Sequence, residues 1–152
     1  MPRLRRASLD DLDLLVAHRR RMWEAMARFT REEHEAASRT YRRWLRPRLR
    51  SGTAAGFIVV EAPSVPVASG VVWLMDAQPR PGWAVTRQAY LMSIFTEPGA
   101  RRHGHASRIT RAAMRWARER GAERISLHAS QEGARVYGRL GFKRTHEMRR
   151  DL

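Results

Sequence analysis

The amino-acid sequence predicts an α/β fold, of the α+β kind, in which helices flank a central mixed β-sheet. The first reason is the order of strand and helix patterns, which is β, α, α, β, β, β, α, β, α, β over residues 1–152. The second is a β-α-β unit over residues 89–128, which should join two parallel strands by a right-handed crossover. The third is a hairpin over residues 56–75, which adds antiparallel strands.

The N-terminal segment predicts a short strand at residues 3–7 followed by a helix. Ser8 and Asp11 form a capping-box pair that marks the start of this helix. The residues that then follow with helical spacing are Leu12, Leu15, Val16, Arg19, Trp23 and Met26. We expect this stripe, including Trp23 and Met26, to face the core, with the arginine stem at its edge.

A second helix is expected next, because Thr30 and Glu33 repeat the capping-box pattern. Its helical stripe consists of Ala37, Tyr41, Trp44 and Leu45. Pro47 should end this helix, since proline lacks a backbone N–H and its ring clashes with the preceding turn.

Three strand patterns and a loop follow in the middle of the chain. Residues 56–61 and 67–75 are apolar runs with two prolines between them, so they predict a hairpin. Residues 78–82 contain two further prolines and predict a loop. The third long strand is expected at residues 89–95.

The C-terminal part predicts a helix, a strand, a second helix and a last strand. The first helix has the apolar stripe Ile109, Ala113, Trp116 and Ala117, and Gly121 is its expected C-cap. The remaining elements are a strand at 123–128, a short helix at 132–140 ended by Gly141, and a strand at 142–148.

The bulk composition fits one globular domain, residues 1–152. Hydrophobic residues make up 43% of the chain and five residues are Trp, which argues against disorder. There is no cysteine, so disulfides and cysteine-based zinc sites are excluded, and a cytoplasmic location fits. The N-terminus lacks a signal-peptide pattern, and no apolar run reaches the roughly 18 residues of a membrane span.

The formal net charge of +15 has two interpretations. One is an electrostatic footprint for nucleic acid or another polyanion. The other is a preference for arginine, since Lys143 is the one lysine and the arginines are scattered through most elements. The second is favoured, because solvated charge is common and no helix-turn-helix, zinc or RNA-recognition pattern occurs. We therefore do not expect nucleic acid as the partner.

The most informative segment is the loop at residues 96–106, between the strand at 89–95 and a helix that begins near His105. A strand that turns through a basic, glycine-containing loop into a helix is a phosphate-binding arrangement. Free backbone N–H groups and the positive end of the helix dipole meet there. Gly104 allows close approach of the backbone, and neighbouring arginines add positive charge.

The order of elements and three motifs, one of them the N-terminal strand followed by two helices, resemble those of the GNAT superfamily of acyl-CoA-dependent N-acyltransferases. The segment Arg101-Arg102-His103-Gly104-His105-Ala106 matches the family pattern Arg/Gln-x-x-Gly-x-Gly/Ala. The segment Ala134-Arg135-Val136-Tyr137-Gly138-Arg139-Leu140-Gly141-Phe142 is similar to the family signature with Tyr-x-x-x-Gly-Phe. The resemblance extends over essentially the whole chain. The sequence departs from the pattern where Arg102 replaces a usual glycine and Ser130 replaces a common asparagine.

The resemblance implies a GNAT-like fold and an acetyltransferase that uses acetyl-CoA as cosubstrate, with no metal. Its acceptor would be a small-molecule or peptide primary amine, and a homodimer is one expectation because many relatives are dimers. The loop would bind the CoA pyrophosphate, and the end of the strand, beside a β-bulge, would pair with the pantetheine amides. The implied CoA-binding residues are Ile94, Phe95, Thr96, Arg101, Arg102, His103, Gly104, His105, Ala106 and Ser130.

The resemblance also makes Tyr137 the candidate general acid. The CoA thiolate that leaves during acyl transfer needs a proton, and a phenol with a pKa near 10 can donate one at neutral pH. The alternative is core packing, because Ala134, Tyr137 and Leu140 also have helical spacing. Catalysis is the favoured interpretation.

The acceptor side of the reaction stays open in the sequence. Glu97, Asp76, Glu24 and His128 are candidate general bases, and deprotonation through water is an equal alternative. By resemblance, the acceptor site consists of residues from the first two helices and the loop at 78–87: Arg19, Met22, Trp23, Met26, Phe29 and Trp83. Two further functions remain as alternatives: a basic polyanion-binding module and a non-catalytic acyl-CoA-binding sensor.

Overall fold

The computed structural model describes residues 1–82 and 86–152 and contains one mixed sheet. Its strands, in the spatial order β1-β2-β3-β4-β5, are β1 (Arg3–Arg6), β2 (Ala54–Glu61), β3 (Val65–Asp76), β4 (Arg87–Thr96) and β5 (Ile125–Leu127). Neighbouring strands are antiparallel except β4 and β5, which are parallel. The predicted fold class, the hairpin and the parallel pairing across the β-α-β unit are therefore confirmed.

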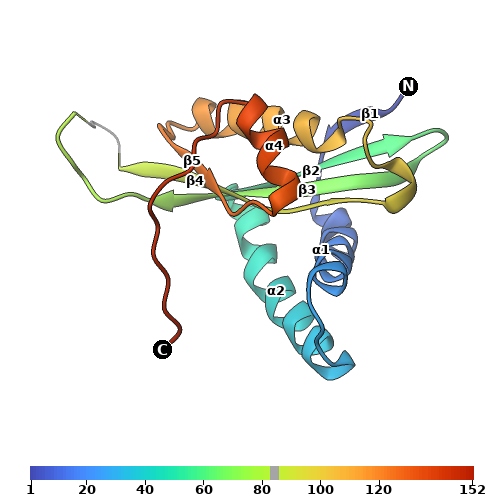
Figure 1. The fold of residues 1–152 in the computed structure, drawn as a ribbon. Coiled ribbons are helices and arrows are strands. Elements are labelled where there is room, and N and C mark those ends of the chain that lie inside the picture. The colour runs from blue at the N-terminus through green and yellow to red at the C-terminus, as the bar shows by residue number, and fades with distance from the viewer. Residues whose placement is uncertain (83–85) are drawn as a thin grey trace.

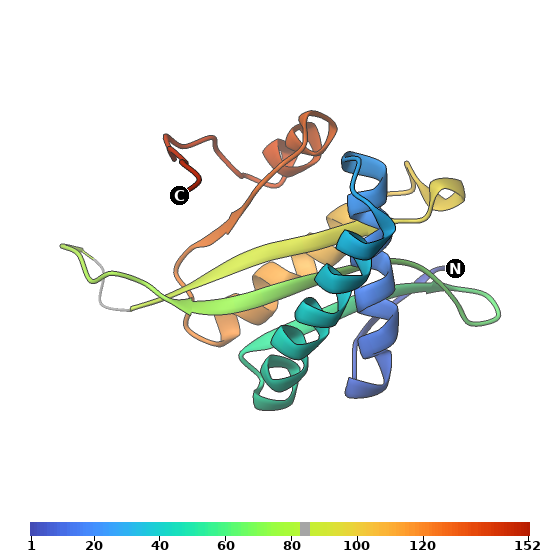
Figure 2. The same ribbon diagram turned by 90° about the horizontal axis from the view of Figure 1, so that it is seen from below.

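Helices cover both faces of this sheet (Figures 1 and 2). The helices are α1 (Leu12–Met26), α2 (Arg31–Ser51), α3 (His105–Glu119) and α4 (Gln131–Arg139), with short 3-10 turns at η1 (Leu9–Asp11) and η2 (Pro98–Ala100). Figure 1 shows α1 and α2 on one face and α3 and α4 on the other. The sheet is thus the middle of three layers, and both of its faces are buried.

The core divides into two clusters because alternate residues of a strand point to opposite faces. On β2, Ala54 and Ile58 pack with α1 and α2, whereas Phe57 and Val59 pack against α3. Burial on both faces explains why β2 reads as a continuous apolar run. The helical stripes expected from the sequence supply the rest: Leu12, Leu15, Val16, Tyr41 and Leu45 on one face, and Ile109, Ala113, Trp116 and Ala117 on the other.

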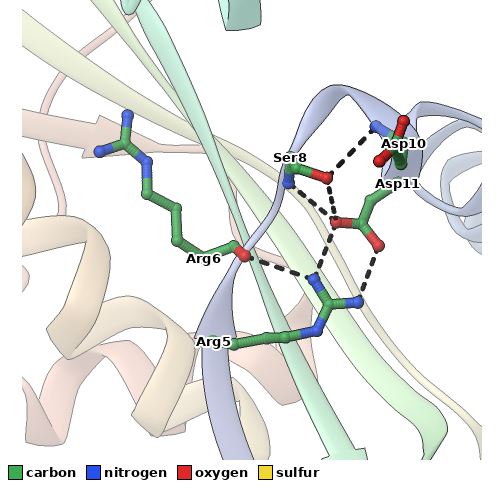
Figure 3. Close-up of polar contacts among 5 residues, drawn as sticks. All are labelled: Arg5, Arg6, Ser8, Asp10 and Asp11. Atoms are coloured by element: carbon green, nitrogen blue, oxygen red, sulfur yellow. Dashed lines mark hydrogen bonds and ion pairs between the residues drawn. The ribbon is translucent and has the colours of Figure 1, made fainter.

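The first capping box ties β1 to α1 through η1 (Figure 3). The Asp11 carboxylate accepts a hydrogen bond from the Ser8 backbone N–H at 2.8 Å, and Ser8 Oγ accepts one from the Asp10 N–H at 3.2 Å. The Arg5 guanidinium donates to both carboxylate oxygens, at 2.7 and 2.8 Å. The bidentate bond from Arg5 is the main reason that the pKa of Asp11 falls from 3.8 to about 2.

The prediction that Pro47 ends the second helix is wrong, since α2 continues to Ser51. The ring of Pro47 faces solvent, and the helix beyond it still packs Leu49 against the core. This packing offsets the roughly 3 kcal/mol cost of an internal proline. The helix ends instead at Gly52, whose φ of +77° is left-handed.

The extents predicted for the two C-terminal strands are also wrong. The strand expected at 123–128 is reduced to three residues, and residues 142–148, expected to be a strand, form no regular element. Of the latter segment, Phe142 packs against the Tyr137 ring at 5.8 Å, but Met148 is 94% exposed. A segment with one anchored apolar side chain gains too little burial to be held as a strand on the sheet edge.

Candidate active site

A β-bulge interrupts β4 in the middle of the sheet. The register between β3 and β4 shifts between Ser69 and Val71, so that β4 has an additional residue opposite Gly70. Ser93, in the bulge, has a φ of +55°. Gly70 accommodates this geometry, because a Cβ there would lie 2.4 Å from Cδ1 of Ile94. The bulge that the family resemblance implied is therefore present, and it redirects the strand at Ile94.

The sheet splits on the other side of the same bulge. β4 pairs with β5 only from Ala89 to Leu91, and β5 ends at Leu127. Residues 92–96 of β4 continue beyond that point without a strand partner on the β5 side. Their backbone groups can pair with an extended ligand that carries amides, as an added strand would.

The loop after β4 has the geometry of an anion-binding turn. Arg102 and Gly104 both have left-handed backbones, with φ of +67° and +76°, and α3 begins at His105 without a side-chain cap. The first N–H groups of a helix lack intrahelical partners, and the helix dipole makes this end positive. Arg101 is exposed, and its Nε donates to the carbonyl of Thr96 at 3.3 Å. The residues fit a phosphate group.

The two histidines of this loop differ in exposure, since His103 is exposed and His105 is buried. His103 Nδ1 lies 3.2 Å from the carbonyl oxygen of Ala100. His105 is 3% exposed, and its Nε2 is 3.5 Å from a carboxylate oxygen of Glu61. Only the backbone of His105 is therefore available to a ligand. The CoA-binding role predicted for His105 is limited to its backbone N–H group.

A pocket of about 770 Å³ lies at the split and extends between α1 and α2. It brings together Ile94, Ser130 and Tyr137 from the predicted cofactor and catalytic set. Its other walls come from the predicted acceptor side and from residues of α2, β4 and β5: Arg19, Met22, Trp23, Met26, Ala36, Ala37, Thr40, Tyr41, Trp44, Tyr90, Leu91, Met92, Ser93, Leu127 and His128. Residues predicted for the donor site and residues predicted for the acceptor site thus line one cavity.

Some predicted site residues lie elsewhere. Phe95, Thr96 and residues 101–106 do not line this pocket; they follow the bulge toward the start of α3. Phe29 packs edge-on to Trp23 at 6.2 Å, next to the pocket wall. Trp83 lies outside the described residues. The interpretation of Trp23 and Met26 as core residues is wrong: Trp23 is half-buried and Met26 is 60% exposed, because α1 projects beyond the sheet at this end.

Tyr137 combines packing with access to the pocket. Its ring contacts Phe142 and the core cluster under α3, while the residue also lines the pocket. Burial raises the pKa of Tyr137 above 10.0, so the phenol keeps its proton at neutral pH. Ser130 has a local role as the N-cap of α4, because its Oγ accepts from the Gly133 N–H at 3.1 Å.

Of the four candidate bases, His128 is the one that lines the pocket. Its Nδ1 is hydrogen-bonded to the hydroxyl of Tyr90, which also lines the pocket, and its Nε2 is 3.3 Å from Glu147. Glu97 forms an ion pair with Arg21. Glu24 pairs with Arg20 at 2.8 Å, and Asp76 is in a separate depression at the far end of β3.

Sequence reasoning missed Tyr90, Ser93 and His18. Tyr90 alternates with Met92 and Ile94 on β4, so the period-two pattern pointed to it. His18 is 3% exposed, and its Nδ1 lies 2.8 Å from Ser69 Oγ, beside the bulge. Burial lowers the pKa of His18, which makes this contact a neutral support for the strand.

Neither a cluster of metal-binding side chains nor a membrane-spanning helix occurs within residues 1–82 and 86–152. In these ranges no three His, Asp or Glu side chains are grouped so as to hold a metal ion. None of the helices there combines the length and apolar character needed to cross a membrane.

The sheet split at a bulge, with a basic turn at its end and a tyrosine beside it, is the arrangement that the resemblance to CoA-dependent acyltransferases implied. The model of the acetyltransferase (GNAT) family matches residues 19–142. The chain therefore belongs to the GNAT acetyltransferase family, and general N-acetyltransferase function follows from that membership.

Solved structures support the same assignment. A GCN5-related N-acetyltransferase from Ralstonia eutropha JMP134 is 27% identical, with a TM-score of 0.90, over 100% of this chain and 99% of that one. A predicted acetyltransferase from Clostridium acetobutylicum, solved with acetyl-CoA, is 25% identical, with a TM-score of 0.89 over 100% and 96%. An aminoglycoside N-acetyltransferase in complex with CoA shares the fold at 20% identity, with a TM-score of 0.72 over 100% and 94%. No curated protein matches the chain.

Proposed function

We propose that the protein transfers an acetyl group from acetyl-CoA to a primary amine by direct attack of the amine on the thioester. One observation carries this proposal: a single pocket joins the split end of β4 to Tyr137 and to the walls of α1 and α2. Acetyl-CoA supplies the activated acyl group and a thiol leaving group. The protein has to hold it, orient the amine and move two protons.

The donor half is assigned to β4 and the start of α3. Backbone N–H groups of the loop at 101–106 bind the pyrophosphate, with Arg101 and Arg102 as additional charge. Backbone groups of Ile94, Phe95 and Thr96 pair with the pantetheine amides, and Ser130 lies across the split. A backbone N–H at the bulge polarises the thioester carbonyl, where negative charge develops during attack.

The proton to the leaving group is assigned to Tyr137. The C–N bond forms as the C–S bond breaks, and the sulfur takes the phenolic proton. The raised pKa of Tyr137 supports this role, because the phenol is protonated before the thiolate leaves. The amide nitrogen keeps one extra proton after attack, and the loss of that proton through water returns the phenolate to its protonated form.

The proton from the attacking ammonium is assigned to His128, through the hydroxyl of Tyr90. The Tyr90 oxygen takes the amine proton while its own proton passes to Nδ1 of His128. Support comes from position, since these two residues line the pocket whereas Glu97 and Glu24 are paired with arginines.

Replacement of this base should slow acetyl transfer. We expect His128→Gln to lower kcat by roughly 10²-fold, because glutamine cannot take the proton that passes from Tyr90. The exposed His146 offers a matched control, and His146→Gln should leave kcat unchanged. An unaltered kcat in His128→Gln would assign the proton to water instead.

The proposed function is tested by thiol release from acetyl-CoA over a panel of simple amines, amino acids, aminoglycosides and peptides. Release that requires both acetyl-CoA and an amine, with an acetylated product of the expected mass, supports the proposal. Binding of acetyl-CoA without release over the whole panel would favour the non-catalytic sensor.

A further inference from the structure

The acceptor end of the pocket holds a cation that pairs with no carboxylate. The Arg19 guanidinium lies 4.3 Å from the ring centroid of Tyr41 and 5.9 Å from that of Trp23, and Arg19 lines the pocket. The next two arginines of α1 behave differently: Arg20 pairs with Glu24, and Arg21 pairs with Glu97. Among the described residues no Asp or Glu forms an ion pair with Arg19.

The half-buried Arg19 guanidinium stacks on aromatic rings and, among the described residues, has no carboxylate partner. Burial lowers the pKa of Arg19 below its usual range, which reflects the cost of removing its charge from water. Ring faces attract the cation, but its five N–H donors need acceptors. A carboxylate matches the planar guanidinium fork with two parallel hydrogen bonds, and Arg is the side chain best suited to bind it.

The positive charge of the pocket disfavours acceptors that carry several positive charges. No carboxylate appears among its described lining residues, whereas Arg19 contributes a positive charge. An aminoglycoside or a polyamine would bring several ammonium groups next to Arg19 without a compensating acid, and like charges at close range repel. A polycation is therefore a poor fit.

The remaining walls of the acceptor end are apolar and aromatic. Met22, Trp23, Met26 and Trp44 line it, and Met26 is 60% exposed at its mouth. Flexible methionine and flat aromatic surfaces bind an apolar side chain without fixing its shape. The pocket thus offers one anion site, one apolar surface and a route to the split at Ile94.

We propose that the acceptor is a free amino acid with an apolar or aromatic side chain, whose carboxylate binds Arg19. The inference rests on the proposed acetyl transfer and names its substrate class. The carboxylate accepts from the guanidinium, the side chain lies on Trp23 and Met26, and the α-amine is thereby held toward the bulge and Tyr137. Arg19 is a specificity residue here and takes no part in proton transfer.

A matched pair of acceptors tests the role of the carboxylate in the unaltered protein. L-phenylalanine and phenethylamine share the ring and the primary amine, and only the first has a carboxylate. Thiol release should show kcat/KM higher by roughly 10- to 100-fold for phenylalanine, the range of a charged hydrogen-bonded pair. Spermidine and kanamycin, as polycations, should react more slowly than phenylalanine.

Variants of Arg19 then locate the effect. Arg19→Met should raise KM for phenylalanine by roughly 10- to 100-fold and so remove its advantage over phenethylamine, while the affinity for acetyl-CoA stays within about twofold. Arg19→Lys should restore part of the preference, because it keeps the charge but not the fork. Arg20→Met is the matched control, since Arg20 pairs with Glu24 and does not line the pocket.

Calorimetric titration with acetyl-CoA separates the two possible failures. If acetyl-CoA does not bind, the proposed function itself fails. Acetyl-CoA can also bind while kcat/KM for phenethylamine or for a polycation equals that for phenylalanine, or while no amino acid reacts. Either result overturns only the carboxylate-binding inference. The comparison of acceptors needs no variant, so it remains decisive even if Arg19→Met does not fold.

Discussion

Tyr137 is a packing residue in this fold, and in the proposed reaction it is also the proton donor. Its ring contacts Phe142 and the core under α3, and the same residue lines the pocket at the sheet split. The two uses make different demands, because packing needs only the ring whereas proton donation needs the hydroxyl. Removal of the hydroxyl alone distinguishes them.

Tyr137→Phe should therefore slow turnover without loosening the structure. We expect kcat to fall by roughly 10²-fold, while the affinity for acetyl-CoA and the unfolding midpoint change little, since the ring remains. Steady-state kinetics and calorimetry on the same preparation give both quantities. Equal kcat in the two proteins would remove Tyr137 from the mechanism.

Arg102 occupies a backbone conformation that favours glycine. Its φ is +67°, at the position where the family motif usually has glycine. A left-handed backbone costs a non-glycine residue of the order of 1 kcal/mol. We expect Arg102→Gly to raise the free energy of unfolding by about 0.5–1 kcal/mol, measured by urea denaturation.

Gly104 also has a left-handed backbone, and replacing this glycine should change the stability in the opposite direction to Arg102→Gly. Its φ is +76°, and Gly104→Ala should lower the free energy of unfolding by about 1 kcal/mol, although a Cβ there would meet no neighbouring atom. Shifts of the same sign in the two variants would argue against backbone strain at Arg102.

Some features of single residues could be predicted from the sequence, and others could not. Tyr137 and Gly104 were predictable because short motifs fix their local geometry. The stacking of Arg19 on Tyr41 and the contact of His18 with Ser69 were not predictable, because each joins elements that only the folded sheet brings together. The sequence gives the positions of Arg19 and His18 along the first helix, but it does not give the residues that they contact.

At the scale of elements, the site depends on β4 and on its two neighbours. The bulge beside β3 and the loss of pairing beside β5 occur within the same few residues of β4. No side-chain pattern in residues 89–96 announces either feature, because both concern backbone pairing. The family resemblance implied them, whereas periodicity predicted only an ordinary strand.

The connection of β1 to α1 gives a pH-dependent contribution to stability. Arg5 holds the pKa of Asp11 at about 2, below its usual 3.8, so the ionised carboxylate stabilises the folded protein. This contribution is complete above about pH 4 and is lost as the pH falls from about 4 to about 2. The contacts involved are those of Figure 3.

Asp11→Asn should accordingly lower the free energy of unfolding by about 1–2 kcal/mol at pH 7, and the deficit should shrink below about pH 4. Denaturation of the two proteins between pH 3 and pH 7 measures this difference. Asp10→Asn is a suitable control, because only the backbone N–H of Asp10 takes part in the contacts with Ser8. A deficit that stays constant down to pH 3 would contradict the assigned role.

The long periodic helices were predictable, as were the short elements β1 and α4. Capping boxes marked the starts of the first two helical segments, and apolar stripes identified α1, α2 and α3. Pro47 misled the prediction because tertiary packing of Leu49 outweighs a local helix breaker. The strand expected at 142–148 failed for the opposite reason, since its local pattern has little tertiary support.

At the scale of the whole molecule, the three layers bring residues of the proposed acceptor site and part of the proposed donor site into one cavity. The helices α1 and α2 form its proposed acceptor walls on one face, while α3 presents its N-terminus at the end of β4 (Figure 2). The net charge of +15 has a specific use at Arg19, Arg101 and Arg102 in this account. The remaining arginines need none, so nucleic acid binding stays an unfavoured alternative.

The central claim is that the loop at 101–106 and the split in the sheet bind acetyl-CoA, and calorimetric titration tests it most directly. We expect saturable binding at one site per chain for the unaltered protein. Gly104→Glu, which adds a carboxylate where the pyrophosphate would lie, should abolish binding while the protein remains folded. No heat of binding at high micromolar acetyl-CoA, or equal affinity in Gly104→Glu, would contradict the account.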